Sequence, residues 1–66
     1  MRITLNGEPH EVARPLSLTE LLVHFDLDPR KVAIERNREI VPRSAYGATP
    51  IGEGDRLEIV HFIGGG

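Results

Sequence analysis

A strong helical pattern, set between segments that alternate like β-strands, constrains the fold of this chain more than any other feature. Four apolar side chains recur at intervals of three and four residues and share one face of a helix: Leu18, Leu21, Leu22 and Phe25. Ser17 and Glu20 form the S-x-x-E capping box that marks a helix start. The residue before a proline avoids the helical region, so Pro29 requires the helix to end earlier, near Phe25 or Asp26.

The chain begins with the pattern of a β-hairpin. Residues 1–6 alternate between apolar and polar side chains, which predicts a strand with one buried face. The pair Asn6-Gly7 then favours a tight turn, because both positions tolerate positive φ. We therefore expect a return strand through residues 11–13. Pro9 places this strand at a sheet edge, since proline has no N–H to donate to a neighbour.

Two more strand patterns follow the helix. Val32 and Ile34 point to the same side of the first, and residues 39–41 form a short second one. The pair Asn37-Arg38 between them has the character of a turn.

The last strand pattern covers residues 56–63. Leu57 and Ile59 face inward by the period of two, while Glu58 and Val60 face outward. Few polar residues interrupt this segment, so we place it at the centre of the sheet, beside the first strand and parallel to it. The order of elements predicts an α+β fold, with the helix covering one face of the sheet.

The segment between the fourth and last strands is irregular. Residues 42–55 contain several prolines and glycines, and we expect one short helical turn around residues 44–46, with Tyr46 packed beneath the loop. Three arginines form a local basic group: Arg36, Arg38 and Arg43. A solvated face is the simpler interpretation of this group, and a contact with an acidic partner is the alternative.

Composition excludes several classes of function. A chain of 66 residues forms one domain at most. It has no cysteine, which excludes disulfides and thiolate nucleophiles and favours the cytoplasm. The net charge of -2 and the 5% aromatic content argue against nucleic-acid binding. No apolar run reaches the roughly 20 residues of a membrane span. The three histidines are far apart and lack clustered carboxylates, so we expect no metal site and no catalytic residue.

The sequence ends in three glycines: Gly64, Gly65 and Gly66. We expect a folded domain over residues 1–63 and a flexible glycine tail over residues 64–66. Three extended residues reach roughly 10 Å, and without Cβ atoms they form a thin tail that fits a narrow channel. The carboxylate at its end becomes reactive when it is converted to a mixed anhydride, for instance with AMP from ATP. The alternative is an incidental glycine terminus.

Three apolar residues next to the tail are candidates for partner docking. Val60 and Phe62 lie on the outward parity of the last strand, and Ile63 follows them. Scattered apolar residues on a surface are ordinary. A contiguous apolar patch beside a functional tail favours a docking surface instead.

Four segments carry a resemblance to a known family: MRITLNGE, SLTELL, VAIERNREIVPR and LEIVHFIGGG. With them the chain resembles the ThiS family, the ubiquitin-like β-grasp sulfur carriers of thiamine biosynthesis. The resemblance covers essentially the whole chain. Its most specific parts are the IVHF ending with its glycines and the ERN segment with the VPR that follows.

The resemblance implies a fold and a chemistry. The fold is a β-grasp, a mixed sheet of four to five strands with one main helix on one face. An E1-like enzyme of the ThiF type adenylates the final glycine with Mg-ATP, which assigns that role to Gly66. A cysteine desulfurase system supplies the sulfur of a thiocarboxylate, and a ThiG-type thiazole synthase receives it. Gly64 and Gly65 become the passage to the reactive end, and the protein acts as a cosubstrate that binds no cofactor of its own.

Three alternatives remain open at the level of sequence. A related β-grasp carrier delivers sulfur to molybdopterin, although such proteins tend to be longer. A ubiquitin-like modifier conjugated to lysine is disfavoured, because Phe62 and Ile63 stand where ubiquitin has basic residues. An interaction or RNA-binding module with an incidental tail is disfavoured by the acidic pI and the scarcity of aromatic residues.

Overall fold

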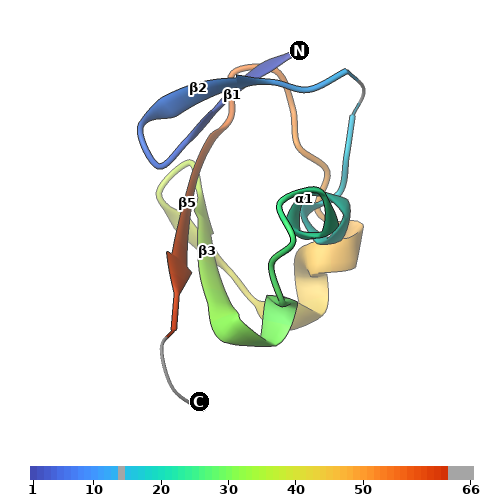
Figure 1. The fold of residues 1–66 in the computed structure, drawn as a ribbon, viewed down its shortest axis with the longest axis vertical. Coiled ribbons are helices and arrows are strands. Elements are labelled where there is room, and N and C mark those ends of the chain that lie inside the picture. Colours follow the sequence, from blue (N-terminus) through green and yellow to red (C-terminus); the bar gives the residue numbers. More distant parts are fainter. Residues whose placement is uncertain (14, 63–66) are drawn as a thin grey trace.

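The computed structural model describes residues 1–13 and 15–62 (Figure 1). Within these ranges the elements are, in order, β1 (Arg2–Leu5), β2 (Glu8–Glu11), α1 (Leu18–His24), the 3-10 turn η1 (Pro29–Lys31), β3 (Val32–Arg36), β4 (Glu39–Val41), the 3-10 helix η2 (Arg43–Ala48) and β5 (Arg56–His61). This order confirms the α+β fold class. The expected boundary between residues 63 and 64 lies outside the described residues.

The five strands of the described ranges form one mixed sheet in the order β2-β1-β5-β3-β4. β5 lies at the centre and runs parallel to β1, with Thr4 opposite Arg56 and Leu5 opposite Leu57. The other neighbouring strands are antiparallel. The predicted central, parallel position of the last strand is therefore confirmed. In Figure 1, α1 lies on one side of the sheet and leaves the other side uncovered by any labelled helix.

Left-handed backbone closes both hairpins. Asn6 and Gly7 have φ values of 50° and 83°, and Asn37 and Arg38 have φ values of 52° and 73°. Asparagine and glycine adopt this region at low cost, which explains why the first turn is recognisable in the sequence. Both predicted turns are confirmed.

The return strand of the first hairpin lies earlier than predicted. β2 spans Glu8–Glu11, so the expected start at residue 11 is wrong, although the Val12 N–H still donates to the Met1 carbonyl over 2.7 Å within the expected segment. A two-residue turn restores strand pairing at once, with Leu5 directly opposite Glu8. Pro9 fits within β2 because this strand is at the edge of the sheet, as predicted.

The capping box at the start of α1 is present as predicted. The Glu20 N–H donates to Ser17 Oγ over 3.1 Å, and the Ser17 N–H donates to Glu20 Oε1 over 3.0 Å. The helix ends at His24, and Asp26 adopts the left-handed conformation, with φ of 58°, that commonly terminates helices. No helix in the described part of the chain is long and apolar enough to cross a membrane.

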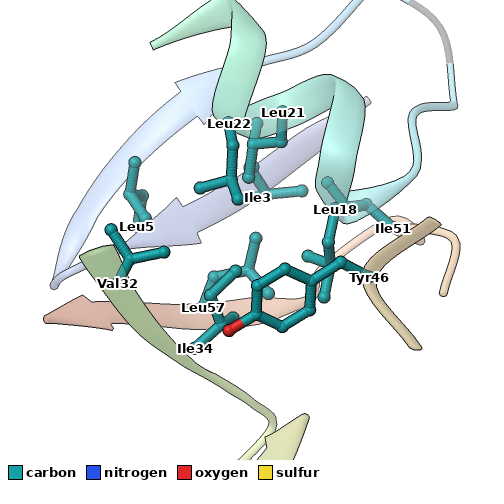
Figure 2. Close-up of a cluster of buried hydrophobic side chains, with 10 residues drawn as sticks. All are labelled: Ile3, Leu5, Leu18, Leu21, Leu22, Val32, Ile34, Tyr46, Ile51 and Leu57. Atoms are coloured by element: carbon teal, nitrogen blue, oxygen red, sulfur yellow. The ribbon is translucent and has the colours of Figure 1, made fainter. Parts of the chain in front are cut away.

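Helix, sheet and the irregular segment share one core, shown in Figure 2. Its buried side chains are Ile3, Leu5, Leu18, Leu21, Leu22, Val32, Ile34, Tyr46, Ile51 and Leu57. Tyr46 comes from η2, a 3-10 helix longer than the expected turn at residues 44–46, and its predicted packing is confirmed. The core therefore fixes the inward residues of β3 and β5 directly beneath α1.

A buried carboxylate fixes the turn that leads into β5. Asp55 accepts from the Gly52 N–H at 2.7 Å, from Arg36 Nε at 3.0 Å and from Asn37 Nδ2 at 3.1 Å. Burial alone raises the pKa of Asp55, but the bonds from Gly52, Asn37 and Arg36 outweigh it and hold the pKa below its ordinary value. Asp55 thereby joins the start of β5 to the end of β3.

Candidate functional site

The candidate site begins where β5 leaves the sheet. In Figure 1, β5 runs from the side of the β1–β2 hairpin toward the opposite end of the molecule. The Phe62 N–H still donates to the Lys31 carbonyl over 2.7 Å, so the backbone remains paired to the end of the described chain. The predicted site residues Ile63, Gly64, Gly65 and Gly66 lie outside the described residues. Their roles stay predictions.

An asparagine supports β5 just before this exit. β1 pairs with β5 only as far as Leu5 opposite Leu57. Beyond that point the side chain of Asn6 replaces a neighbouring strand. Its Nδ2 donates to the Ile59 carbonyl over 3.2 Å, and its Oδ1 accepts from the Ile59 N–H over 2.8 Å. Sequence reasoning recognised Asn6 as a turn residue and missed this contact, because its partner is 53 residues away.

The two candidate docking residues within the described chain are on the surface. Val60 is 60% exposed and Phe62 is 43% exposed, whereas Leu57 on the opposite parity is buried. The predicted outward orientation of the pair is therefore confirmed. Val60 lies opposite Ala33 on β3, so the apolar surface continues from β5 onto its neighbour. The docking role itself stays a prediction.

Ile40 extends this apolar surface to the sheet edge. It is 68% exposed and lies opposite Glu35, whose neighbour Ile34 is buried on the other face. Sequence reasoning did not single out Ile40. The signal was available in the sequence. A two-residue turn at Asn37-Arg38 pairs Ile40 with Glu35, and paired residues of neighbouring strands lie on the same face of the sheet. We call the exposed side chains of Ile40, Val60 and Phe62 the apolar outer face.

The predicted basic group is divided in the structure. Arg36 is paired with the buried Asp55, so it does not belong to a shared solvated face with the other two arginines. Arg43 donates to the Arg30 carbonyl over 3.3 Å, and Arg38 is an exposed turn residue. The interpretation of the three as one basic surface is therefore wrong. Arg36 has a structural role, because its guanidinium is one of the three donors, after Gly52 and Asn37, that hold the pKa of the mostly buried Asp55 below its ordinary value.

Two of the histidines, one on β2 and one at the end of α1, pack against an aromatic ring. His10 and His24 contact Phe25 edge to face, with ring centroids 5.5 Å and 5.2 Å from that of Phe25. They border a hollow of about 360 Å³ between the end of β2 and α1, which Leu16 and Leu21 also line. No group of three or more potential metal ligands occurs in residues 1–13 and 15–62.

Comparison with known proteins settles the family. The family model of ThiS matches residues 3–66. The chain belongs to the ThiS family. The crystal structure of the thiamine biosynthesis protein ThiS from Geobacter metallireducens shares 39% identity with this chain. The two superpose with a TM-score of 0.86 and full coverage of both, which confirms the β-grasp architecture.

Two kinds of curated relative bear on the role of this ThiS-family chain. The sulfur carrier protein ThiS of Bacillus subtilis is 38% identical over 50 residues, which cover 76% of each chain. A thiazole synthase of Magnetococcus marinus is 50% identical over all 66 residues, and one of Paramagnetospirillum magneticum is 47% identical. The chain spans about a fifth of the length of these two synthases, 20% in each case. The name of the Bacillus relative describes a sulfur carrier, and that of the Geobacter structure describes a thiamine biosynthesis protein.

Proposed function

We propose that this chain carries sulfur as a thiocarboxylate on Gly66 for the formation of the thiazole ring of thiamine. The observation that carries the proposal is the match to the ThiS family, which extends through residue 66 and so includes all three glycines. The name of the Bacillus relative, a sulfur carrier protein, supports the same role.

The proposed chemistry has two steps. In the first, a carboxylate oxygen of Gly66 attacks the α-phosphorus of Mg-ATP on a ThiF-type enzyme, and the bond to pyrophosphate breaks. In the second, a sulfur donor at the oxidation level of hydrosulfide attacks the carbonyl carbon. The carbon–oxygen bond to AMP then breaks, and AMP leaves with the electron pair. Activation is necessary because a free carboxylate is a poor acyl electrophile. A cysteine desulfurase system takes this sulfur from cysteine as a persulfide, and a thiol reductant supplies the two electrons that bring it to the hydrosulfide level.

The fold contributes positioning to this chemistry. β5 is the central strand and is held by β3 on one side and by β1 and Asn6 on the other. A strand fixed on both sides gives the following segment a defined point of departure. From there, three glycines span at most about 10 Å, the depth to which the tail can enter a partner's active site. The chain itself acts as a protein cosubstrate, and Mg-ATP binds to the adenylating enzyme.

The proposed recipient is a ThiG-type thiazole synthase. Two relatives with 50% and 47% identity to the whole chain are named thiazole synthases, although the chain matches only a fifth of each. Association of a ThiS-like region with a synthase in one polypeptide favours the thiazole recipient over molybdopterin.

Intact-mass analysis tests the proposal. The natural full-length protein is incubated with the adenylating enzyme, Mg-ATP, the desulfurase of the same organism, cysteine and a thiol reductant. We expect ATP–pyrophosphate exchange and a mass gain equal to the replacement of one oxygen by sulfur. Deletion of Gly66 removes both signals while the thermal melt of the domain is preserved. Normal exchange by the truncated protein contradicts the assignment of Gly66.

A further inference from the structure

Two glutamates face each other on the side of the sheet that points away from α1. Glu35 on β3 lies directly opposite Glu58 on β5 in the antiparallel pairing. Both alternate with buried neighbours, since Ile34 and Leu57 are in the core. The two carboxylates therefore share the uncovered face, and we call them the acidic pair.

The acidic pair is unfavourable for the isolated domain. Side chains directly opposite each other on neighbouring strands have Cβ atoms about 4.5–5.5 Å apart, and like charges at such positions destabilise a sheet. Neither carboxylate forms a hydrogen bond or an ion pair with any residue in 1–13 or 15–62. Arg56 is on the same face two residues before Glu58, and it forms no ion pair with it in this part of the chain. Folding alone gives no reason for this arrangement.

The residues around the acidic pair indicate which kind of side chain from a partner could bind it. Ile40 lies opposite Glu35 on the far side of β3, and Val60 follows Glu58 by two residues on the same face of β5. The acidic pair is thus flanked by two of the most exposed apolar side chains of the domain. A partner that covers these side chains also removes water from the carboxylates. Such a partner must supply a cation, because an unpaired buried charge is strongly unfavourable.

A guanidinium group satisfies these conditions better than an ammonium group. Arginine presents a planar fork of five donors that can reach two carboxylates at once, and it is more weakly hydrated than lysine. Self-association through this face is disfavoured, because it would bring four carboxylates together in a chain of net charge -2.

We propose that the acidic pair is the recognition point for the recipient thiazole synthase, which inserts an arginine between Ile40 and Val60 and bridges Glu35 and Glu58. This assignment rests on the proposed function and deepens it. The synthase is the occupant because the two thiazole synthases described above contain a region related to this whole chain, with 50% and 47% identity. Val60 also belongs to the strand that leads to the glycines, so docking here directs the tail to the same protein.

Binding measurements with a matched charge control test the acidic pair. The full chain and the double variant Glu35→Gln/Glu58→Gln are titrated with the purified thiazole synthase of the same organism at low and high salt. We expect about tenfold weaker binding of the variant at low salt and a smaller difference at high salt. The same variant should melt about 1–5 °C higher, because the repulsion is gone.

The control variant Glu8→Gln/Glu39→Gln removes the same charge from the two edge strands. Glu8 lies opposite Leu5, and Glu39 lies opposite Arg36. Both glutamates are exposed, and their positions along the strands alternate with those of the outward-facing residues, so they are not on the face of the acidic pair. We expect the control to bind like the unaltered chain. Equal weakening of both variants would show an effect of net charge and would overturn the acidic pair as a recognition point.

Other outcomes separate this inference from the proposed function. Unchanged synthase binding by the Glu35/Glu58 variant overturns the inference. The inference also fails if the variant binds only the adenylating enzyme more weakly, or if the unaltered chain does not bind the synthase at all. If the unaltered chain binds the synthase but never gains sulfur, the proposed function fails and the acidic pair is still tested by the titration. If the variant gains sulfur normally and binds the synthase tenfold more weakly, both stand.

Discussion

The two faces of the β3–β5 pair present opposite kinds of surface although they alternate along the same backbone. Toward α1, Ile34 and Leu57 are almost completely buried in the core that Figure 2 shows. Away from α1, the acidic pair and exposed Val60 meet solvent. A period of two separates the residues that determine stability from those that are free to determine binding. Substitutions on the inner face should therefore change the stability of the fold, and substitutions on the outer face should change the affinity for partners.

The largest expected effect lies on the inner face. Ile34→Ala removes a fully buried side chain between sheet and helix, and we expect it to lower the free energy of unfolding by about 2–5 kcal/mol. A domain of this size has little stability in reserve. Val60→Ala, on the outer face opposite Ala33, should change it by less than about 0.5 kcal/mol. Urea unfolding followed by circular dichroism measures both. Similar losses in the two variants would contradict the division between the faces.

A second effect belongs to the outer face and concerns binding. Phe62→Ala should weaken binding to both the adenylating enzyme and the thiazole synthase by about 2 kcal/mol, roughly thirtyfold, because a covered aromatic anchor is commonly a hot spot. Its thermal melt should change little, since Phe62 is 43% exposed. Calorimetric titrations and melts on the same variant separate the two effects. A collapsed melt with unchanged affinity per folded molecule would make Phe62 part of the core.

A third effect tests the buried carboxylate at the start of β5. The pKa of Asp55 is lower in the folded state than its ordinary value of 3.8. Its stabilisation is therefore complete above that pH and is lost as the pH falls through the folded-state pKa. Asp55→Asn should cost about 1–3 kcal/mol at pH 7, because one of the two oxygens that accept from Arg36, Asn37 and Gly52 is replaced by an amide nitrogen that cannot accept. It should also flatten the acid limb of the stability profile. An acid limb as steep as that of the unaltered chain would refute this role.

The smallest effect concerns the support of β5 by Asn6. Glycine fits the φ of 50° at this position, so Asn6→Gly preserves the turn and removes only the two side-chain bonds to Ile59. We expect a loss of about 1 kcal/mol and faster amide hydrogen exchange at Ile59. Exchange at Ile34, in the core of β3, should accelerate less. Equal acceleration at both amides would indicate general destabilisation.

Local signals account for most of what the sequence predicts correctly. The capping box of Ser17 and Glu20 and the turn at Asn6-Gly7 each need only residues within a few positions. Parity along β5 likewise sufficed to place Val60 and Phe62 on the surface. The predicted start of β2 was wrong because a two-residue turn at Asn6-Gly7 requires the return strand to begin at residue 8. The prediction recognised the turn but placed the strand later.

The missed features depend on the assembled fold. Asp55 meets Arg36 from 19 residues away, and Asn6 meets Ile59 from 53 residues away. No local pattern carries these pairings. The facing of Glu35 and Glu58 also follows from the register between β3 and β5, which only the complete sheet determines. The turn η1 had a local signal, because Asp28 caps it and Pro29 occupies its first position.

The central claim is that Gly66 carries the sulfur, and one measurement tests it most directly. The natural protein is purified from its own cells, and its intact mass and the fragmentation of its C-terminal peptide are determined. The account predicts a population in which one oxygen at Gly66 is replaced by sulfur and which disappears after deletion of the adenylating enzyme. A sulfur found at any other residue, or a Gly66 carboxylate unchanged in cells that are making thiamine, would contradict it.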